Sequence, residues 1–121
     1  MTQEQADGLH GALNDGSSGG PSGGLSEPRE LLNAPLLDMH RALTSLIDRL
    51  ATLDRYNQRI EACTDPELRL VMASQRDATR KHVAMLLEWM RRRDPKLDKE
   101  LRDALFKAGP IAAQYHYDEG I

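Results

Sequence analysis

The sequence has few aromatic residues and a single cysteine. Its 121 residues include one phenylalanine, one tryptophan and three tyrosines, and the cysteine is Cys63. A lone cysteine rules out an intrachain disulfide, and with it the class of secreted, disulfide-stapled scaffolds. We interpret Cys63 as a thiol without a role. Because so few aromatic side chains give one chain only a thin core, we expect copies of the chain to associate.

Long apolar runs and a strong net charge are also missing. No stretch approaches the length of a membrane span, and the polar, acidic N-terminus lacks the pattern of a signal peptide. Residues 1–33 carry five acids and one base, whereas residues 34–110 carry 15 bases and 12 acids. This mild balance argues against a dedicated nucleic-acid binder, and Arg91–Arg93 suit a helix C-terminus better than a nucleic-acid patch. We therefore expect a soluble cytoplasmic protein with neither a membrane nor a nucleic acid as partner.

Glycine is concentrated at one end of the chain. Residues 1–33 hold seven of the nine glycines, including the run GSSGGPSGG, which buries almost nothing and is typical of a flexible tether. The sequence thus predicts a disordered extension over 1–33, a helical domain over 34–110 and a short tail over 111–121.

The first long helix is predicted from about Pro35 to Ala62, with Asn33 or Ala34 at its cap. Its leucines and a methionine recur three and four residues apart, which is the spacing of a helix-packing seam. The seam is Leu36, Met39, Leu43, Leu46, Leu50 and Leu53, and beside it runs a smaller, more polar row of Ala42, Ser45, Arg49, Thr52 and Tyr56.

Two further helices follow. Thr64-x-x-Glu67 has the spacing of a capping box with Pro66 in the first turn, and Asp94-Pro95 ends that helix and begins a third one. The third helix carries Leu97, Leu101 and Leu105 on one side, and Gly109-Pro110 is expected to end it. The fold class is therefore all-α, an antiparallel two-helix hairpin with a short C-terminal helix. Two such hairpins complete a four-helix bundle.

One face of the second helix is unusual. Gln75, Thr79, His82 and Leu86 follow one another at spacings of four, three and four residues. Thr79-x-x-His82 stands where a di-iron bundle protein carries Glu-x-x-His. Two interpretations of His82 stay open. It is either a neutral, core-facing imidazole hydrogen-bonded to Thr79 or Gln75, or a metal ligand, for instance in a relocated site with Asp77 or Tyr56.

Several short segments form a specific pattern through their order and spacing. They are His40-Arg41-Ala42, Asp54, Tyr56-Asn57-Gln58-Arg59, Thr64-Asp65-Pro66-Glu67-Leu68, Arg76-Asp77, His82-Val83-Ala84-Met85, Leu87-Glu88-Trp89, Leu105-Phe106 and Gly109-Pro110-Ile111. Together they run without gaps from about His40 to Ile111 and resemble the encapsulated ferritin family. This resemblance implies a hairpin that dimerises into a ferritin-like bundle and assembles into a ring-shaped decamer. It also implies oxidation of ferrous iron inside an encapsulin shell that stores the mineral.

The same resemblance implies a damaged iron site. The family's di-iron ligands are a glutamate on the first helix and a Glu-x-x-His pair on the second. Arg49 and Thr79 stand at the two glutamate positions, and His82 keeps the histidine position. Tyr56 and Asp48 match residues beside the family's centre. Two classes of function stay open: a non-catalytic encapsulin cargo without a bound cofactor, or an active ferroxidase or metal-binding protein that uses a rearranged site or a co-assembled intact paralogue.

The N-terminal extension contains a short segment similar to the family's shell-docking peptide. Leu9, Gly11, Ala12 and Leu13 form an apolar pair on a small-residue backbone, and the Gly/Ser linker follows them. A chance pair of leucines in a disordered tail is the alternative. The docking interpretation makes an encapsulin shell protein the partner.

Overall fold

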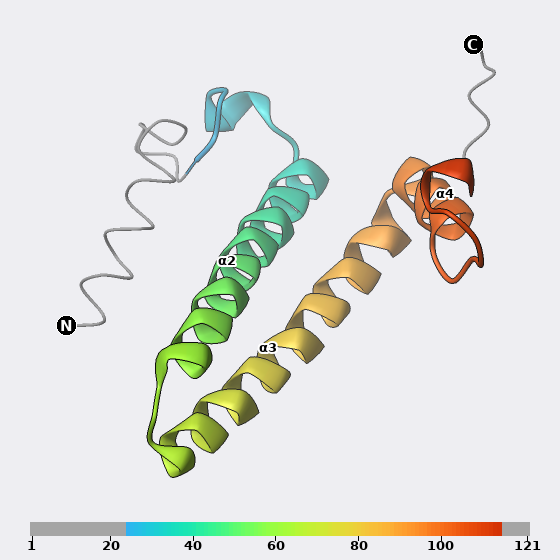
Figure 1. The fold of residues 1–121 in the computed structure, drawn as a ribbon. Coiled ribbons are helices and arrows are strands. Elements are labelled where there is room, and N and C mark those ends of the chain that lie inside the picture. Colours follow the sequence, from blue (N-terminus) through green and yellow to red (C-terminus); the bar gives the residue numbers. More distant parts are fainter. Residues whose placement is uncertain (1–23, 115–121) are drawn as a thin grey trace. The chain divides into compact units, whose positions relative to one another are not determined.

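The computed structural model describes residues 24–114, and all regular secondary structure in that range is helical. A short 3-10 helix, η1 (Arg29–Leu31), precedes three α-helices: α2 (Ala34–Ala62), α3 (Pro66–Arg93) and α4 (Pro95–Ala104). A second 3-10 helix, η2 (Ala112–Gln114), follows. Helices α2 and α3 run antiparallel as a hairpin, with α4 beyond the end of α3 (Figure 1), so the predicted all-α hairpin is confirmed. No helix in this range is long and apolar enough to cross a membrane.

The chain divides into two units, Met1–Asp38 and Met39–Ile121. In the described part of the first unit, Asn33 caps α2, because its side-chain Oδ1 accepts a hydrogen bond of 2.9 Å from the Leu36 amide. The η1 helix lies inside the extension predicted over residues 1–33. Leu9, Gly11, Ala12 and Leu13 lie outside the described residues, as does the end of the tail from residue 115.

The second unit contains most of the hairpin and α4, and in it α3 and α4 are capped by aspartates. Asp65 caps α3 by accepting a hydrogen bond of 2.7 Å from the Leu68 amide, with Pro66 as the first helical residue. The predicted capping box at Thr64 is therefore wrong by one residue. The reason is that a carboxylate is a charged acceptor and also favours the positive end of the helix dipole.

The end of α4 differs from the prediction. Asp94 caps this helix by accepting hydrogen bonds of 3.1 Å from the amides of Lys96 and Leu97, as expected. The helix ends at Ala104, well before Gly109. Phe106 is left-handed, with φ 60°, which is the conformation that commonly stops a helix just past its last turn. This conformation is usually taken by glycine, and no glycine signal marks the position in the sequence.

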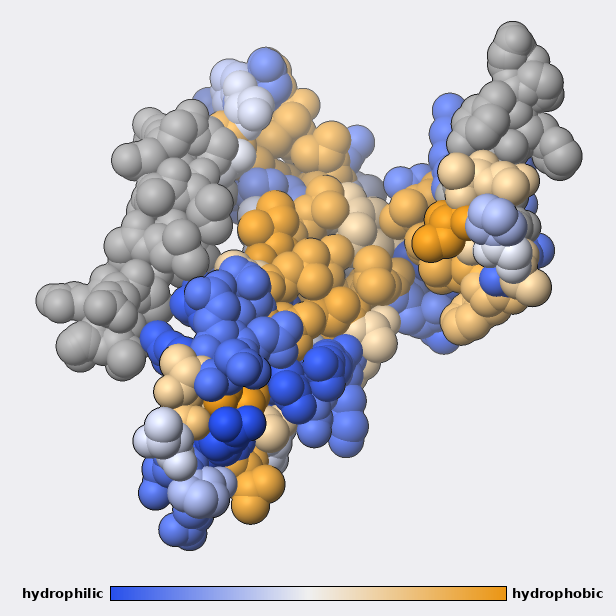
Figure 2. All heavy atoms as spheres, viewed as in Figure 1, coloured by the Kyte–Doolittle hydropathy of each residue, from blue (hydrophilic) through white to orange (hydrophobic). Residues whose placement is uncertain are grey.

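One copy of the hairpin buries little. Ala42, Thr79 and Met90 are the residues classed as buried in the described range. The predicted seam on α2 divides along its length: Met39, Leu46 and Leu53 are half-buried, whereas Leu43 and Leu50 are exposed. A helix with one neighbour covers only one side of a broad apolar stripe, so the other side stays open. Figure 2 shows apolar side chains gathered on the surface over the middle of the hairpin.

Candidate functional site

A groove of about 430 Å³ runs between α2 and α3 in the second unit. Helix α2 contributes three polar side chains to it, and α3 contributes a histidine followed by larger apolar side chains. The lining residues are Ser45, Asp48 and Arg49 of α2, and His82, Met85, Leu86 and Trp89 of α3. Within each helix successive lining positions are one or three residues apart, and together they occupy one side of the helix. The groove therefore brings together Asp48, Arg49 and His82, which were predicted to lie at or beside the site.

Arg49 and His82 are both exposed in the groove. Neither side chain forms a hydrogen bond or ion pair with another residue of the described range 24–114. The interpretation of His82 as a core-facing imidazole bound to Thr79 or Gln75 is therefore wrong. The physical reason is that His82 lies on the groove side of α3, whereas the side that faces into the hairpin is filled by smaller or apolar groups.

Thr79 is buried and does not line the groove. Its hydroxyl donates a hydrogen bond of 3.0 Å to the backbone carbonyl of Gln75, one turn earlier on α3. Such back-bonding to position i−4 is a common way for a threonine to satisfy its hydroxyl inside a helix. The hydroxyl is thus already paired with the backbone. Tyr56 is half-buried and is also absent from the groove lining.

The sequence did not single out Ser45 and Trp89 as site residues. Ser45 is one helical turn before Arg49, and Trp89 is two turns after His82. This helical spacing is the signal in the sequence that could have identified both residues. The Trp89 ring is held from outside the groove by Arg93, whose guanidinium carbon lies 4.6 Å from the ring centroid. This contact gives the groove a firm apolar wall.

The donor set of the groove does not fit a pair of iron ions. Ferroxidase chemistry needs several carboxylates that bridge the metals and neutralise their charge. Each chain offers one carboxylate, from Asp48, and one imidazole, from His82, beside the permanently charged guanidinium of Arg49. At 4 Å and an effective dielectric of about 20, that guanidinium repels each unit of metal charge by about 4 kcal/mol. Within residues 24–114 no three His, Cys, Asp or Glu side chains are grouped closely enough to hold a metal ion.

The relocated metal site with Asp77 has no support in the geometry. Asp77 does not line the groove and instead forms ion pairs with Arg76 at 3.5 Å and Arg80 at 3.1 Å. Asp48 is the carboxylate that shares the groove with His82.

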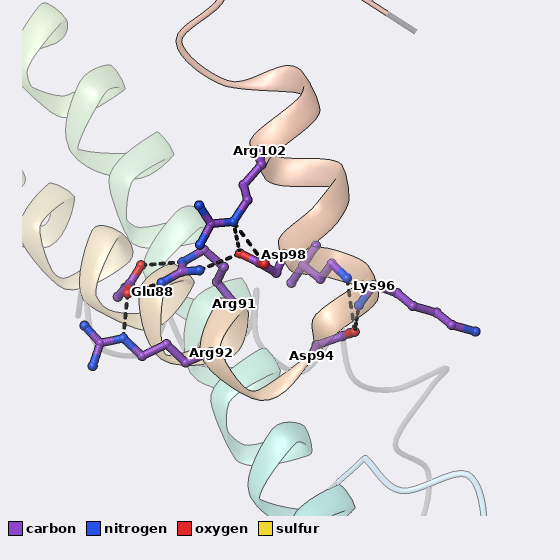
Figure 3. A network of polar contacts seen from close by, with 8 residues as sticks. Glu88, Arg91, Arg92, Asp94, Lys96, Asp98 and Arg102 are labelled. Carbon is purple, nitrogen blue, oxygen red and sulfur yellow. Dashed lines mark hydrogen bonds and ion pairs between the residues drawn. The ribbon is translucent and has the colours of Figure 1, made fainter. Parts of the chain in front are cut away.

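A network of charged side chains fastens α4 to the end of α3 (Figure 3). Glu88 accepts hydrogen bonds of 2.7 Å from Arg91 and 2.6 Å from Arg92. Arg91 also donates to Asp98 of α4, which accepts a second bond, of 2.9 Å, from Arg102. The hydrogen bonds from Arg91 and Arg92 lower the pKa of the Glu88 carboxyl from 4.5 to about 2.

The same network shows what the run of three arginines does. Arg91 and Arg92 bind carboxylates of this chain, and Arg93 stacks on Trp89. All three guanidinium groups therefore have partners within the chain.

Comparisons with known proteins agree with this architecture. A sequence profile of the EncFtn-like family matches residues 24–108. The "Encapsulated ferritin-like protein" of Rhodospirillum rubrum is 46% identical over 87 residues, which cover 72% of this chain and 62% of that protein. The chain thus spans less than two thirds of that relative. The "Ferritin-like protein" of Thermotoga maritima is 39% identical over 85 residues, covering 70% of this chain and 75% of that protein.

A solved crystal structure is also similar. A protein from Nitrosomonas europaea superposes with a TM-score of 0.71 and 52% sequence identity, covering 74% of this chain and 98% of that one. At this identity the similarity extends beyond the general helical architecture to the sequence itself. The profile match covers more than half of the chain, and the relatives bear the corresponding names. The chain belongs to the EncFtn-like family.

Proposed function

We propose that this protein is a cargo subunit of an encapsulin nanocompartment, associated with iron storage, in which the family's ferroxidase centre has been lost. The observation that carries the proposal is the content of the α2–α3 groove: a guanidinium, one carboxylate and one imidazole per chain. His82 stands at the retained ligand position, and Arg49 and Thr79 stand at the positions of the two missing glutamates. In this proposal Tyr56 and Asp48 are remnants of the surroundings of the centre and hold no iron pair by themselves.

The first test is an iron titration of the purified full chain. We expect no ferroxidase activity above the rate in buffer, and no binding of two ferrous ions per pair of chains at micromolar concentration. The variant Arg49→Glu removes the fixed positive charge and places a second carboxylate in the groove, and it is the matched gain-of-function control. Stoichiometric iron binding by the natural chain at micromolar affinity would contradict the proposal.

Association of copies forms the second part of the proposal. One hairpin leaves Leu43, Ile47 and Leu50 of α2 exposed, and its groove side is open as well. A second hairpin covers one of these sides and completes four helices, as in other ferritin-like bundles. Since two different sides of α2 need covering, association beyond a dimer, into a ring, follows from the same reasoning.

Location inside a shell is the third part. The name of the Rhodospirillum rubrum relative, "Encapsulated ferritin-like protein", supports enclosure within a compartment, and we infer that this compartment is a cytoplasmic encapsulin shell. We assign shell docking to Leu9, Gly11, Ala12 and Leu13, which the Gly/Ser run separates from the helical domain.

Co-expression with an encapsulin shell protein tests the docking assignment. Deleting residues 1–16 is expected to abolish co-purification with the shell. Deleting residues 17–23 instead shortens the linker but keeps the docking segment, and we expect that variant to load. Equal loading of both deletions would remove residues 1–16 from the docking role without bearing on the iron result.

A second candidate function rests on the shared position of Asp48 and His82 in the groove. Two copies related by a two-fold axis bring two carboxylates and two imidazoles, which is a plausible ligand number for one divalent ion. An active metal site would then arise by rearrangement, or through co-assembly with an intact paralogue. Elemental analysis of the native assembly distinguishes the candidates, because this one requires about one metal ion per pair of chains.

A further inference from the structure

The hydrogen-bond donors of the α2–α3 groove are more numerous than its acceptors. Arg49 carries five N–H donors in a planar fork, and His82, Ser45 and Trp89 add an imidazole, a hydroxyl and an indole N–H. Asp48 is the one side chain of the lining that only accepts when ionised. A ligand that satisfies this set is rich in acceptor oxygens.

The two strongest donors have no partner of their own. Arg49 and His82 form no hydrogen bond or ion pair with any other residue between 24 and 114. By contrast, Arg80, Arg91 and Arg102 of the second unit each bind a carboxylate at hydrogen-bond distance. The groove thus presents a free guanidinium and a free imidazole from two facing helices.

The shape of the groove suits a small ligand held by these groups. Ser45 and Arg49 are one turn apart on α2, and His82 reaches the same space from α3. Trp89, Leu86 and Met85 form the apolar part of the lining on the α3 side. A volume of about 430 Å³ leaves room for a small tetrahedral or planar anion with some of its water.

From these observations we propose that the groove is a binding site for a small oxyanion, held by Arg49 and His82 with Ser45 as a further donor. The guanidinium fork binds two oxygens of the anion, and the His82 ring donates to a third. Asp48 opposes binding through its charge, so the arrangement of donors and not the net charge selects the ligand. This inference does not depend on shell docking. It depends on the proposed function in one respect only, which is that the groove does not hold a pair of iron ions.

Inorganic phosphate is the probe, titrated into the full chain by calorimetry at constant ionic strength. Three single variants each change one side chain of the lining, and a fourth variant is the control. Arg49→Gln removes the fork, His82→Gln removes the imidazole, and Asp48→Asn removes the opposing charge. The control is Lys81→Gln, which removes one positive charge from the residue next to His82, outside the groove lining.

Each variant removes one charged or hydrogen-bonding group, and the expected change is in the affinity for phosphate. Arg49→Gln weakens phosphate binding by about tenfold or more, and His82→Gln weakens it by a smaller factor. Asp48→Asn strengthens binding, and Lys81→Gln changes it by less than about twofold. Sulfate and acetate in place of phosphate show whether tetrahedral or carboxylate anions are preferred, and binding of either at least as tightly as phosphate supports the site.

Several results would overturn the proposal. They are the absence of phosphate binding at millimolar concentration, equal affinities of the natural chain and Arg49→Gln, and equal weakening by Lys81→Gln and Arg49→Gln. Circular dichroism of each variant separates loss of the ligand from loss of the helices. Iron binding by the natural chain would contradict the proposed function, and the phosphate titration would still decide the oxyanion site.

Discussion

The substitution Ile47→Glu probes the part of the hairpin that one copy leaves uncovered. Leu43, Ile47 and Leu50 of α2 are 40%, 55% and 47% exposed. At 100° per residue, this stripe lies about 160° around the helix from Ser45 and Asp48 of the groove. It is therefore a separate surface, and a second copy that covers it buries apolar area without disturbing the groove.

The size of the effect follows from those exposed fractions. Complete burial of a leucine or isoleucine side chain contributes about 1.5–3 kcal/mol, so the exposed half of Ile47 contributes about 0.8–1.7 kcal/mol in each of two copies. Losing both weakens association by about 1.6–3.3 kcal/mol, which is about 15-fold to 250-fold in the dissociation constant. A buried carboxylate adds a desolvation cost in the same direction. Sedimentation velocity and native mass spectrometry over a range of concentrations measure the change.

Leu70→Glu is the matched control for this experiment. Leu70 on α3 is 73% exposed, and its helical position points away from α2. The control introduces the same charge at a similarly exposed leucine, and we expect association to stay within about twofold of the natural chain. If Ile47→Glu assembles like the natural chain, or if both variants weaken assembly equally, the α2 stripe is not an interface. Unchanged far-ultraviolet circular dichroism confirms that the hairpin still folds.

Two further predictions concern stability. Met90→Ala removes one of the few buried side chains, and we expect a loss of about 2–5 kcal/mol in urea unfolding at fixed protein concentration, against less than about 1 kcal/mol for the exposed Met85→Ala. Glu88 links stability to pH: its pKa is lowered to about 2 in the folded chain, so its contribution is fully present above the ordinary value of 4.5 and is lost as pH falls toward about 2. Glu88→Gln is therefore expected to flatten the decline of the urea midpoint over this range, and an unchanged decline would contradict the role of the network.

Most of the fold was predictable because its boundaries are set by local chemistry. Pro66 and Pro95 fit only the first turn of a helix, and Asn33 and Asp94 supply acceptors for free amides. The two errors at helix ends have local causes as well. Asp65 is the cap of α3 in place of Thr64. Phe106 adopts a left-handed backbone conformation, which a phenylalanine in the sequence does not predict.

The site was only partly predictable, because the sequence does not fix how far each helix is rotated about its axis. A leucine every three or four residues covers a broad stripe, and the rotation of α2 decides which half of it faces α3. This rotation buries Ala42 and leaves Leu43 exposed beside it. The rotation of α3 in turn places Thr79 and His82, which are three residues apart on that helix, in different surroundings. Thr79 turns inward to the Gln75 carbonyl, whereas His82 opens into the groove.

The two uncovered sides of α2 differ in chemistry, and this difference predicts the order of assembly. Covering Leu43, Ile47 and Leu50 with a second copy lowers the free energy of association, because these three side chains are apolar and carry no charge that must be desolvated. The groove side carries Arg49, and burying a guanidinium without a counter-charge costs several kcal/mol. We therefore expect the apolar side to associate first, at lower protein concentration and with little dependence on salt. Association through the groove side is expected to require an anion or an acidic side chain beside Arg49, and to weaken as chloride screens that pairing. Sedimentation velocity in sodium chloride of increasing concentration separates the two steps, because Ile47→Glu removes the first and Arg49→Gln changes the salt dependence of the second.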